Sequence, residues 1–214
     1  MTGVQTCALP ICAIYTENAL DPNPSFRVLG PLANQNIEAV LSRPGYLLAA
    51  GDNGVFRSTD SGATVQFLSN ATIATPGQLP VQPANGGTYF YADADPTNPN
   101  IVFVAGKLGV FRTNNFLAAT PIWTNITDPR MQIGASTDNL KLSINSSASG
   151  TVLYIGVVNN GSLVSVLYST QRGTTGSWNL MDLPVNLSTP QSITDATNEM
   201  GIREVTTLLL PQDY

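Results

Sequence analysis

A repeat of about 55 residues constrains this chain more than any other feature of its sequence. The string GVFR occurs at Gly54–Arg57 and again at Gly109–Arg112, 55 residues later, and each copy follows an apolar run. A more divergent copy, VLYST, begins at Val166 and continues the period. Trp123 and Trp178 also lie 55 residues apart. A period in this range indicates that one structural unit recurs along the chain.

Each repeat contains four short runs rich in Val, Ile, Leu, Tyr and Phe, separated by Gly, Asn, Asp and Pro. Such runs are typical of β-strands, and helical periodicity is weak throughout. Four-stranded antiparallel units that repeat radially form β-propellers, which close with roughly 4 to 8 blades. We therefore predict an all-β fold, a partial β-propeller of about three four-stranded antiparallel blades plus the start of a fourth. The predicted blades span residues 36–70, 88–127 and 139–183, and the next one starts within 203–214.

A motif in the first repeat resembles a known family. Residues Ser58–Val65, STDSGATV, resemble the Asp-box, or bacterial neuraminidase repeat, whose pattern is Ser-x-Asp-x-Gly-x-Thr-Trp. The stretch Asp95–Asn115 is similar to the approach to that box in sialidase-like, sortilin-like, xyloglucanase-like and photosystem II assembly factor propellers. The resemblance implies a turn between the third and fourth strands of a blade. Val65 replaces Trp, the second box is lost in TNNFLAATPIW, and the third has Gln171 where Asp is expected.

The motif predicts a structural role for its residues. Asp60 can accept hydrogen bonds from N–H groups of its own turn, and Gly62 permits a positive φ. We therefore assign a structural role to Ser58, Asp60, Gly62 and Thr64. Arg57 and Arg112 occupy equivalent positions in two repeats, which favours a packing or surface role over a unique catalytic one. Asp93 and Asp95 resemble a calcium loop, but the start of a Pro-rich turn is the favoured interpretation.

Composition excludes several classes of function. The chain has no histidine, which removes His-based catalytic triads and His-ligated metals. Its formal charge of −5 with nine scattered cations gives no basic surface for nucleic acid. Only 11% of its residues are charged, a balance that suits extracellular β proteins. We predict no metal, no cofactor, no nucleic-acid partner and no membrane span in this chain.

The first eleven residues, MTGVQTCALPI, resemble a translated sequencing adapter, and we expect them to lie outside the fold. Residues 12–35 are then a linker or the remnant of a preceding blade. Cys7 lies within the adapter-like string and Cys12 follows it, so their spacing is not interpreted as a metal or redox site. We also expect the natural N-terminus, with any signal peptide, to be missing.

Strand alternation predicts where a ligand would bind. In a four-stranded antiparallel blade the 1–2 and 3–4 turns share one end, while the 2–3 turn and the connection to the next blade share the other. The long segments at this second end, here called the connection end, are typical of functional loops. The candidate binding residues on them, none supported by a motif, are Asp128, Arg130, Asp138, Glu199 and Arg203.

Three functional classes remain open. The first is a secreted or cell-surface propeller that binds a glycan or a protein. The second is a glycoside hydrolase of the sialidase or xyloglucanase type, although no catalytic motif is present and the early Arg-Ile-Pro of sialidases is absent. The third is a scaffold similar to the photosystem assembly factor. The sequence favours them in this order, and if the parent protein is an enzyme we expect a glycosidase.

Overall fold

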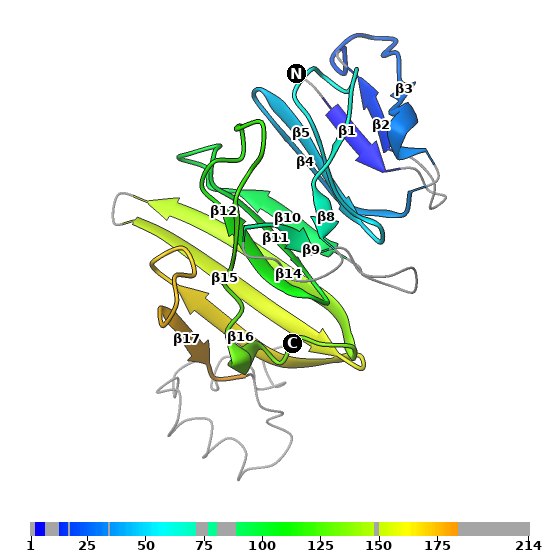
Figure 1. Ribbon diagram of the computed structural model, residues 1–214. Coiled ribbons are helices and arrows are strands. Elements are labelled where there is room, and N and C mark those ends of the chain that lie inside the picture. The colour runs from blue at the N-terminus through cyan, green and yellow to red at the C-terminus, as the bar shows by residue number, and fades with distance from the viewer. Residues whose placement is uncertain are drawn as a thin grey trace, which may run out of the picture.

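Three four-stranded antiparallel sheets form the main part of the fold, and in each sheet the strands are ordered as in the chain. The computed structural model describes residues 3–6, 13–16, 18–33, 35–71, 77–80, 89–147 and 150–183. Figure 1 shows the sheets following one another along the molecule, and the first strand of each packs beside that of the next. The prediction of an all-β fold built from propeller-type blades is confirmed. The predicted start of a fourth blade, 203–214, lies outside the described residues.

The strands of each sheet follow the predicted order of short apolar runs. The first sheet comprises β4 (Ile37–Arg43), β5 (Tyr46–Gly51), β6 (Gly54–Ser58) and β7 (Gln66–Phe67). The second comprises β10 (Tyr89–Ala94), β11 (Val102–Gly106), β12 (Gly109–Thr113) and β13 (Trp123–Asn125). The third comprises β14 (Thr137–Ser147), β15 (Gly150–Asn159), β16 (Ser162–Ser169) and β17 (Trp178–Met181). Val55, Val110 and Val166 therefore lie on equivalent third strands, as the repeat predicts.

The repeated glycine of GVFR has a definite steric role at the turn between the second and third strands. Gly54 and Gly109 have φ of 129° and 127°. A Cβ on Gly54 would lie 2.8 Å from the Cβ of Ser69, and one on Gly109 would lie 2.3 Å from the hydroxyl of Thr127. Each of these hydroxyls accepts the N–H of the valine that follows the glycine, at 2.9 Å. The glycine is therefore needed because this hydroxyl approaches the backbone so closely.

Apolar side chains fill the spaces between sheets. Alternate residues of β11 face opposite sides, as the two-residue period of a strand requires. Val102 and Val104 belong to the core shared with the first sheet, whereas Phe103 and Ala105 belong to the core shared with the third. All four are fully buried. The middle sheet is therefore apolar on both faces, as expected for a blade with a neighbour on each side.

Smaller elements flank the three sheets. A three-stranded sheet, drawn in dark blue in Figure 1, precedes the first four-stranded sheet. It contains β1 (Gly3–Thr6), β2 (Ala13–Thr16) and β3 (Arg27–Val28), so part of the adapter-like string pairs with the fold. A short parallel pair, β8 (Ser69–Ala71) and β9 (Leu79–Pro80), follows the first sheet. Within the described ranges, the helical turns are the 3₁₀ segments η1 (Gly30–Leu32) and η2 (Pro129–Met131). No helix among the described residues is long and apolar enough to span a membrane.

Candidate functional site

The loop between β6 and β7 is braced by its own side chains. Asp60 Oδ1 accepts hydrogen bonds from the Ser58 hydroxyl and the Thr64 N–H, both at 2.8 Å, and Oδ2 accepts from the Thr64 hydroxyl at 2.6 Å. The Ser58 oxygen accepts the N–H of Gly62 at 2.7 Å, and Gly62 has φ of 87°. The bonds from Thr64, followed by that from Ser58, hold the pKa of Asp60 at about 2. The carboxylate is therefore ionised at neutral pH and closes its own turn.

The second sheet keeps this bracing with different residues, although the Asp-box sequence itself is lost there. Asn115 Oδ1 accepts from the Thr113 hydroxyl at 2.8 Å and from the N–H of Ile122 at 2.9 Å. The Thr113 oxygen accepts the N–H of Asn115 at 3.2 Å. Asn115 thus occupies the place of Asp60, and Thr113 that of Ser58. A search for Asp at a fixed distance from Trp misses this loop because the acceptor is an amide and the loop is longer.

The third sheet keeps a reduced form of the same loop. Ser169 Oγ accepts the N–H groups of Gln171 and Gly173 at 3.1 and 2.9 Å. The Ser169 hydroxyl also lies 2.7 Å from that of Ser177, the residue before Trp178. Ser177 replaces the missing carboxylate as hydrogen-bond partner of the first residue of the loop.

A fourth loop of this kind precedes the first sheet and was not predicted from the sequence. Asn18 Oδ1 accepts from the Thr16 hydroxyl at 2.8 Å and from the N–H of Ser25 at 2.9 Å. The segment TENALDPNPSF, 16–26, has the same length as TNNFLAATPIW, 113–123, and shares its first Thr, its Asn, a Leu, a Pro and the final aromatic residue. The loop joins β2 to β3, which are therefore equivalent to the third and fourth strands of a blade.

The two repeated arginines connect neighbouring sheets. Arg57 donates to the carbonyl oxygens of Phe116 and Ala118, the latter at 2.9 Å, in the 3–4 loop of the second sheet. Arg112 donates to the carbonyl of Arg172 at 2.8 Å, in the 3–4 loop of the third sheet. Phe116 and Arg172 each lie three residues after the first residue of their loop. The packing role predicted for Arg57 and Arg112 agrees with these contacts.

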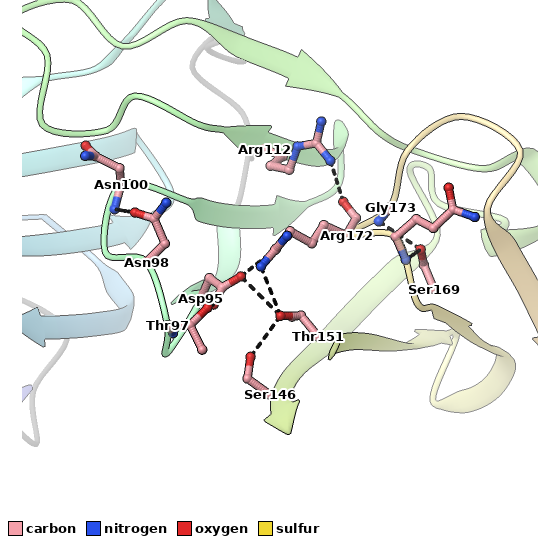
Figure 2. A network of polar contacts seen from close by, with 11 residues as sticks. Asp95, Thr97, Asn98, Asn100, Arg112, Ser146, Thr151, Ser169, Arg172 and Gly173 are labelled. Carbon is pink, nitrogen blue, oxygen red and sulfur yellow. Dashed lines mark hydrogen bonds and ion pairs between the residues drawn. The ribbon is translucent and has the colours of Figure 1, made fainter. Parts of the chain in front are cut away.

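A polar network joins the second and third sheets (Figure 2). The buried carboxylate of Asp95 accepts from the Arg172 Nε at 2.6 Å and from the Thr97 N–H at 2.8 Å. Arg172 also donates to the Thr151 hydroxyl at 3.1 Å. Burial raises the pKa of Asp95, but the bonds from Thr97 and the charge of Arg172 outweigh it and keep that pKa below its ordinary value. The buried anion is therefore compensated by protein groups.

Asp93 and Asp95 are each paired with protein groups in the described part of the chain. Asp93 pairs with Arg43 of the first sheet at 3.0 Å, and Asp95 starts the turn after β10 by accepting the N–H and hydroxyl of Thr97. Over the described ranges, no group of three or more His, Cys, Asp or Glu residues could hold a metal ion. The geometry favours the interpretation of Asp95 as the start of a Pro-rich turn.

The structure brings together two of the predicted binding residues, Asp128 and Arg130. Their side chains form a two-point ion pair with distances of 2.8 and 2.9 Å. Arg130 also donates to the carbonyl of Trp178 at 2.8 Å, which attaches η2 to the outermost strand of the third sheet. The hydrogen bonds from Arg130 hold the pKa of Asp128 below its ordinary value. These two side chains are therefore largely satisfied by protein contacts, while Glu199 and Arg203 lie outside the described residues.

The third described candidate, Asp138, lies apart from that pair, at the connection end of β14. This strand is the first of its sheet, and the first strands β4, β10 and β14, which pack beside one another, are here called the innermost strands. Asp138 is exposed, and its carboxylate accepts the N–H of Gly161 in the 2–3 turn. A β-bulge interrupts the pairing at Asp138, and bulges occur at equivalent places in β4 and β10, at Glu38 and Phe90. Bulges reorient side chains and are common next to functional sites. Exposed Glu38 and Asp138 therefore flank half-buried Phe90 along the innermost strands.

The opposite end of the first sheet contains an open cavity of about 480 Å³. Its described lining consists of Ser42–Leu47 from the hairpin of β4 and β5, with Thr59 and Ser61 from the 3–4 loop. The sequence does not predict this cavity, because the tight turn that leaves it open resembles any other Pro-Gly hairpin.

Comparison with known proteins shows the fold alone. No protein-family model matches the chain, and no curated protein matches it. Among solved structures, it is similar to an ancestral GH74 enzyme, with a TM-score of 0.56 and 13% identity, over 92% of this chain and 27% of that one. GH74 enzymes are propeller-type glycoside hydrolases. The chain thus has a propeller-type fold and spans about a quarter of the length of that enzyme.

Proposed function

We propose that this chain is part of a secreted or cell-surface β-propeller of the Asp-box type and that it binds a glycan at the connection end of its sheets. The family assignment is supported by four loops with a common pattern of hydrogen bonds. The side chain that accepts the hydroxyl of the first loop residue is Asp60 in one loop and Asn115 or Asn18 in two others. In the last loop, Ser177 replaces it as the hydrogen-bond partner. The extracellular location is supported by the small share of charged residues.

The observation that carries the binding site is the set of three bulges on the innermost strands. Carboxylates accept hydrogen bonds from sugar hydroxyls, and aromatic faces pack against the apolar faces of sugars. Glu38 and Asp138 are exposed on either side of Phe90 at one end of the sheets. This arrangement suits a neutral glycan better than a nucleic acid, because the exposed charges are negative.

A second candidate function is glycoside hydrolysis, and the similarity to a GH74 enzyme favours it. Glycosidases use two carboxylic acid side chains on either side of the scissile bond. Glu38 and Asp138 are the described carboxylates at the connection end of the innermost strands that would be tested for these roles. A complete site would need further parts of the protein, since the chain covers only 27% of that enzyme.

The test is a glycan-binding assay on the purified protein with matched carboxylate variants. Glu38→Gln and Asp138→Asn should each weaken binding about tenfold, the change expected when a charged hydrogen bond worth about 1.4 kcal/mol is lost. Asp182→Asn, an exposed carboxylate beyond β17, is the control and should bind as the original protein does. Equal binding by all variants contradicts the proposed site. Release of reducing sugar that is lost in both variants would instead support hydrolysis.

A further inference from the structure

The cavity at the hairpin of β4 and β5 lies at the end of the first sheet opposite to the proposed glycan site. Its volume of about 480 Å³ is within the range of roughly 300–1,000 Å³ that is typical of small-molecule sites. It is bounded by the turn at Pro44 and Gly45 on one side and by Thr59 and Ser61 on the other. The cavity therefore has walls from two separate segments of one sheet.

In the other two sheets, hydrogen bonds bridge the corresponding place. In the second sheet, Asn100 accepts the N–H groups of Phe116 and Leu117, each at 3.0 Å, and so joins the 1–2 turn to the 3–4 loop. In the third sheet, Arg172 of the 3–4 loop donates to Thr151 of the second strand at 3.1 Å. In the first sheet the tight turn is too short for such a bridge. The cavity is thus a local departure from the repeat.

The residue type at the arginine position of the preceding unit differs as well. The carbonyls of Phe116 and Arg172 accept an arginine from the third strand of the sheet before. Ser61 holds the same place in the first sheet, with φ of 58°, and its carbonyl accepts no hydrogen bond within the described part of the chain. The residue in the position of that arginine is Tyr15. The lining of the cavity therefore includes a carbonyl oxygen that accepts no hydrogen bond from another described residue.

The side chains of the lining are polar but carry little net charge. The hydroxyls of Ser42, Thr59 and Ser61 have no hydrogen-bond partner among the described residues. The Arg43 guanidinium is paired with Asp93 at 3.0 Å. A charged ligand would leave a charge uncompensated here, whereas a neutral molecule with many hydroxyls could use the free donors and acceptors.

One buried polar group beside the cavity is also unpaired. The Tyr46 hydroxyl has no partner among the described residues, and the side chain is 3% exposed. Burial is the main cause that raises the pKa of Tyr46 to about 12, so the hydroxyl remains a neutral donor at neutral pH. The ring packs against Phe116 in the core between the first and second sheets, so the cost of this unpaired hydroxyl falls within that core.

We infer that the cavity between the Pro44–Gly45 turn and the β6–β7 loop binds a small neutral saccharide, at a second site separate from the connection end. The inference rests on the proposed function in that both sites take saccharides, but the two sites share no residue. Binding here would attach one end of the blade to a glycan chain while the other end holds the principal ligand.

The test uses the whole chain, titrated with cellobiose, maltose and lactose, with sialyllactose as the charged counterpart of lactose. Binding is measured by the backbone amide signals of Gly45 and Ser61 in nuclear magnetic resonance spectra. At least one neutral disaccharide should shift both signals, and lactose should bind no more weakly than sialyllactose. Absence of shifts with all three neutral probes, or tighter binding of the sialylated probe, overturns the inference.

Two matched tryptophan variants locate the site. Thr59→Trp fills the cavity and should weaken binding at least tenfold, whereas Thr175→Trp places the same side chain on the exposed loop of the third sheet and should have no effect. If Thr59→Trp does not fold, Ser61→Ala removes one hydroxyl and should give a smaller loss in the same direction. Unchanged affinity in the folded cavity variant contradicts the inference. The Glu38→Gln/Asp138→Asn double variant should keep these shifts, so failure of the connection-end site is distinguishable from failure here.

Discussion

At the scale of single residues, one hydrogen-bonding role is filled by different side chains. The side chain in this role accepts two hydrogen bonds. One comes from the N–H of a residue near the end of the loop, and the other comes from the hydroxyl of the first residue of the loop. Asp60 does this with a carboxylate, and Asn115 does it with an amide oxygen at nearly the same distances. The position therefore requires an acceptor oxygen and does not require a negative charge, which explains why the sequence motif degenerates while the loop persists.

This requirement predicts the behaviour of two variants at one position. Asp60→Ala removes the acceptor and should lower the melting temperature by about 2–4 °C for a chain of this size, whereas Asp60→Asn should change it much less. The pKa of Asp60 is lowered to about 2, so the part of the stabilisation that depends on its charge is present above its ordinary pKa near 4 and is lost as the pH falls toward 2. The protonated carboxyl keeps an acceptor oxygen, so the difference in melting temperature between the original protein and Asp60→Ala, followed by circular dichroism, should shrink only in part between pH 4 and pH 2. Equal destabilisation by both substitutions would show that the charge itself is required.

At the scale of elements, arginines on the third strands connect each sheet to the loop of the next. Arg57 is buried, lies 5.4 Å from the centre of the Phe116 ring and donates to several carbonyls. Arg112 makes one such bond, and its Nε has no hydrogen-bond partner among the residues that the structure describes. The first arginine therefore contributes more to the contact between sheets than the second.

We expect Arg57→Met to reduce the free energy of unfolding by about 1–3 kcal/mol, because buried carbonyl oxygens lose their donors. Arg112→Met should reduce the free energy of unfolding by a smaller amount, because it removes a single hydrogen bond. Lys107→Met, in the 2–3 turn at the other end of the second sheet, is the control. Its free energy of unfolding should differ from that of the original protein by no more than about 0.5 kcal/mol. Urea unfolding of the three variants measures these losses of stability. A larger loss for Arg112→Met than for Arg57→Met would contradict the prediction.

The contacts between elements also show what the sequence could predict. The repeat predicted the strands, the third-strand valines and the packing role of the arginines, because each depends on local spacing and on periodicity. The pair of Asp95 with Arg172 joins residues 77 positions apart in sequence. The fourth loop at Thr16–Phe26 was missed because its acceptor is Asn18 and its length matches only the second loop. Pairings that depend on how sheets stack have no signal in a single sequence.

At the scale of the whole molecule, the outer face of the third sheet differs from its two counterparts. Leu48 and Phe103 hold one equivalent position in the first two sheets and are fully buried, whereas Tyr154 in the third is 39% exposed. Leu163 of the third sheet is 44% exposed. Leu48 and Phe103 are covered because a further sheet packs on them, so the exposure of Tyr154 arises from the neighbour and not from the blade itself.

An uncovered apolar sheet face promotes association between molecules. The 214-residue chain should therefore self-associate in solution, with an average mass that rises with protein concentration between about 1 and 100 μM, the range in which exposed apolar surface drives aggregation. Tyr154→Lys combined with Leu163→Lys should reduce this association, because two charges on the exposed face oppose close packing. Val28→Lys combined with Leu20→Lys, two exposed apolar residues that precede the first four-stranded sheet, is the matched control for the change in net charge. Light scattering across the concentration series gives the result: a monomer at every concentration, or equal association in both variants, would show that this face does not drive contact between copies.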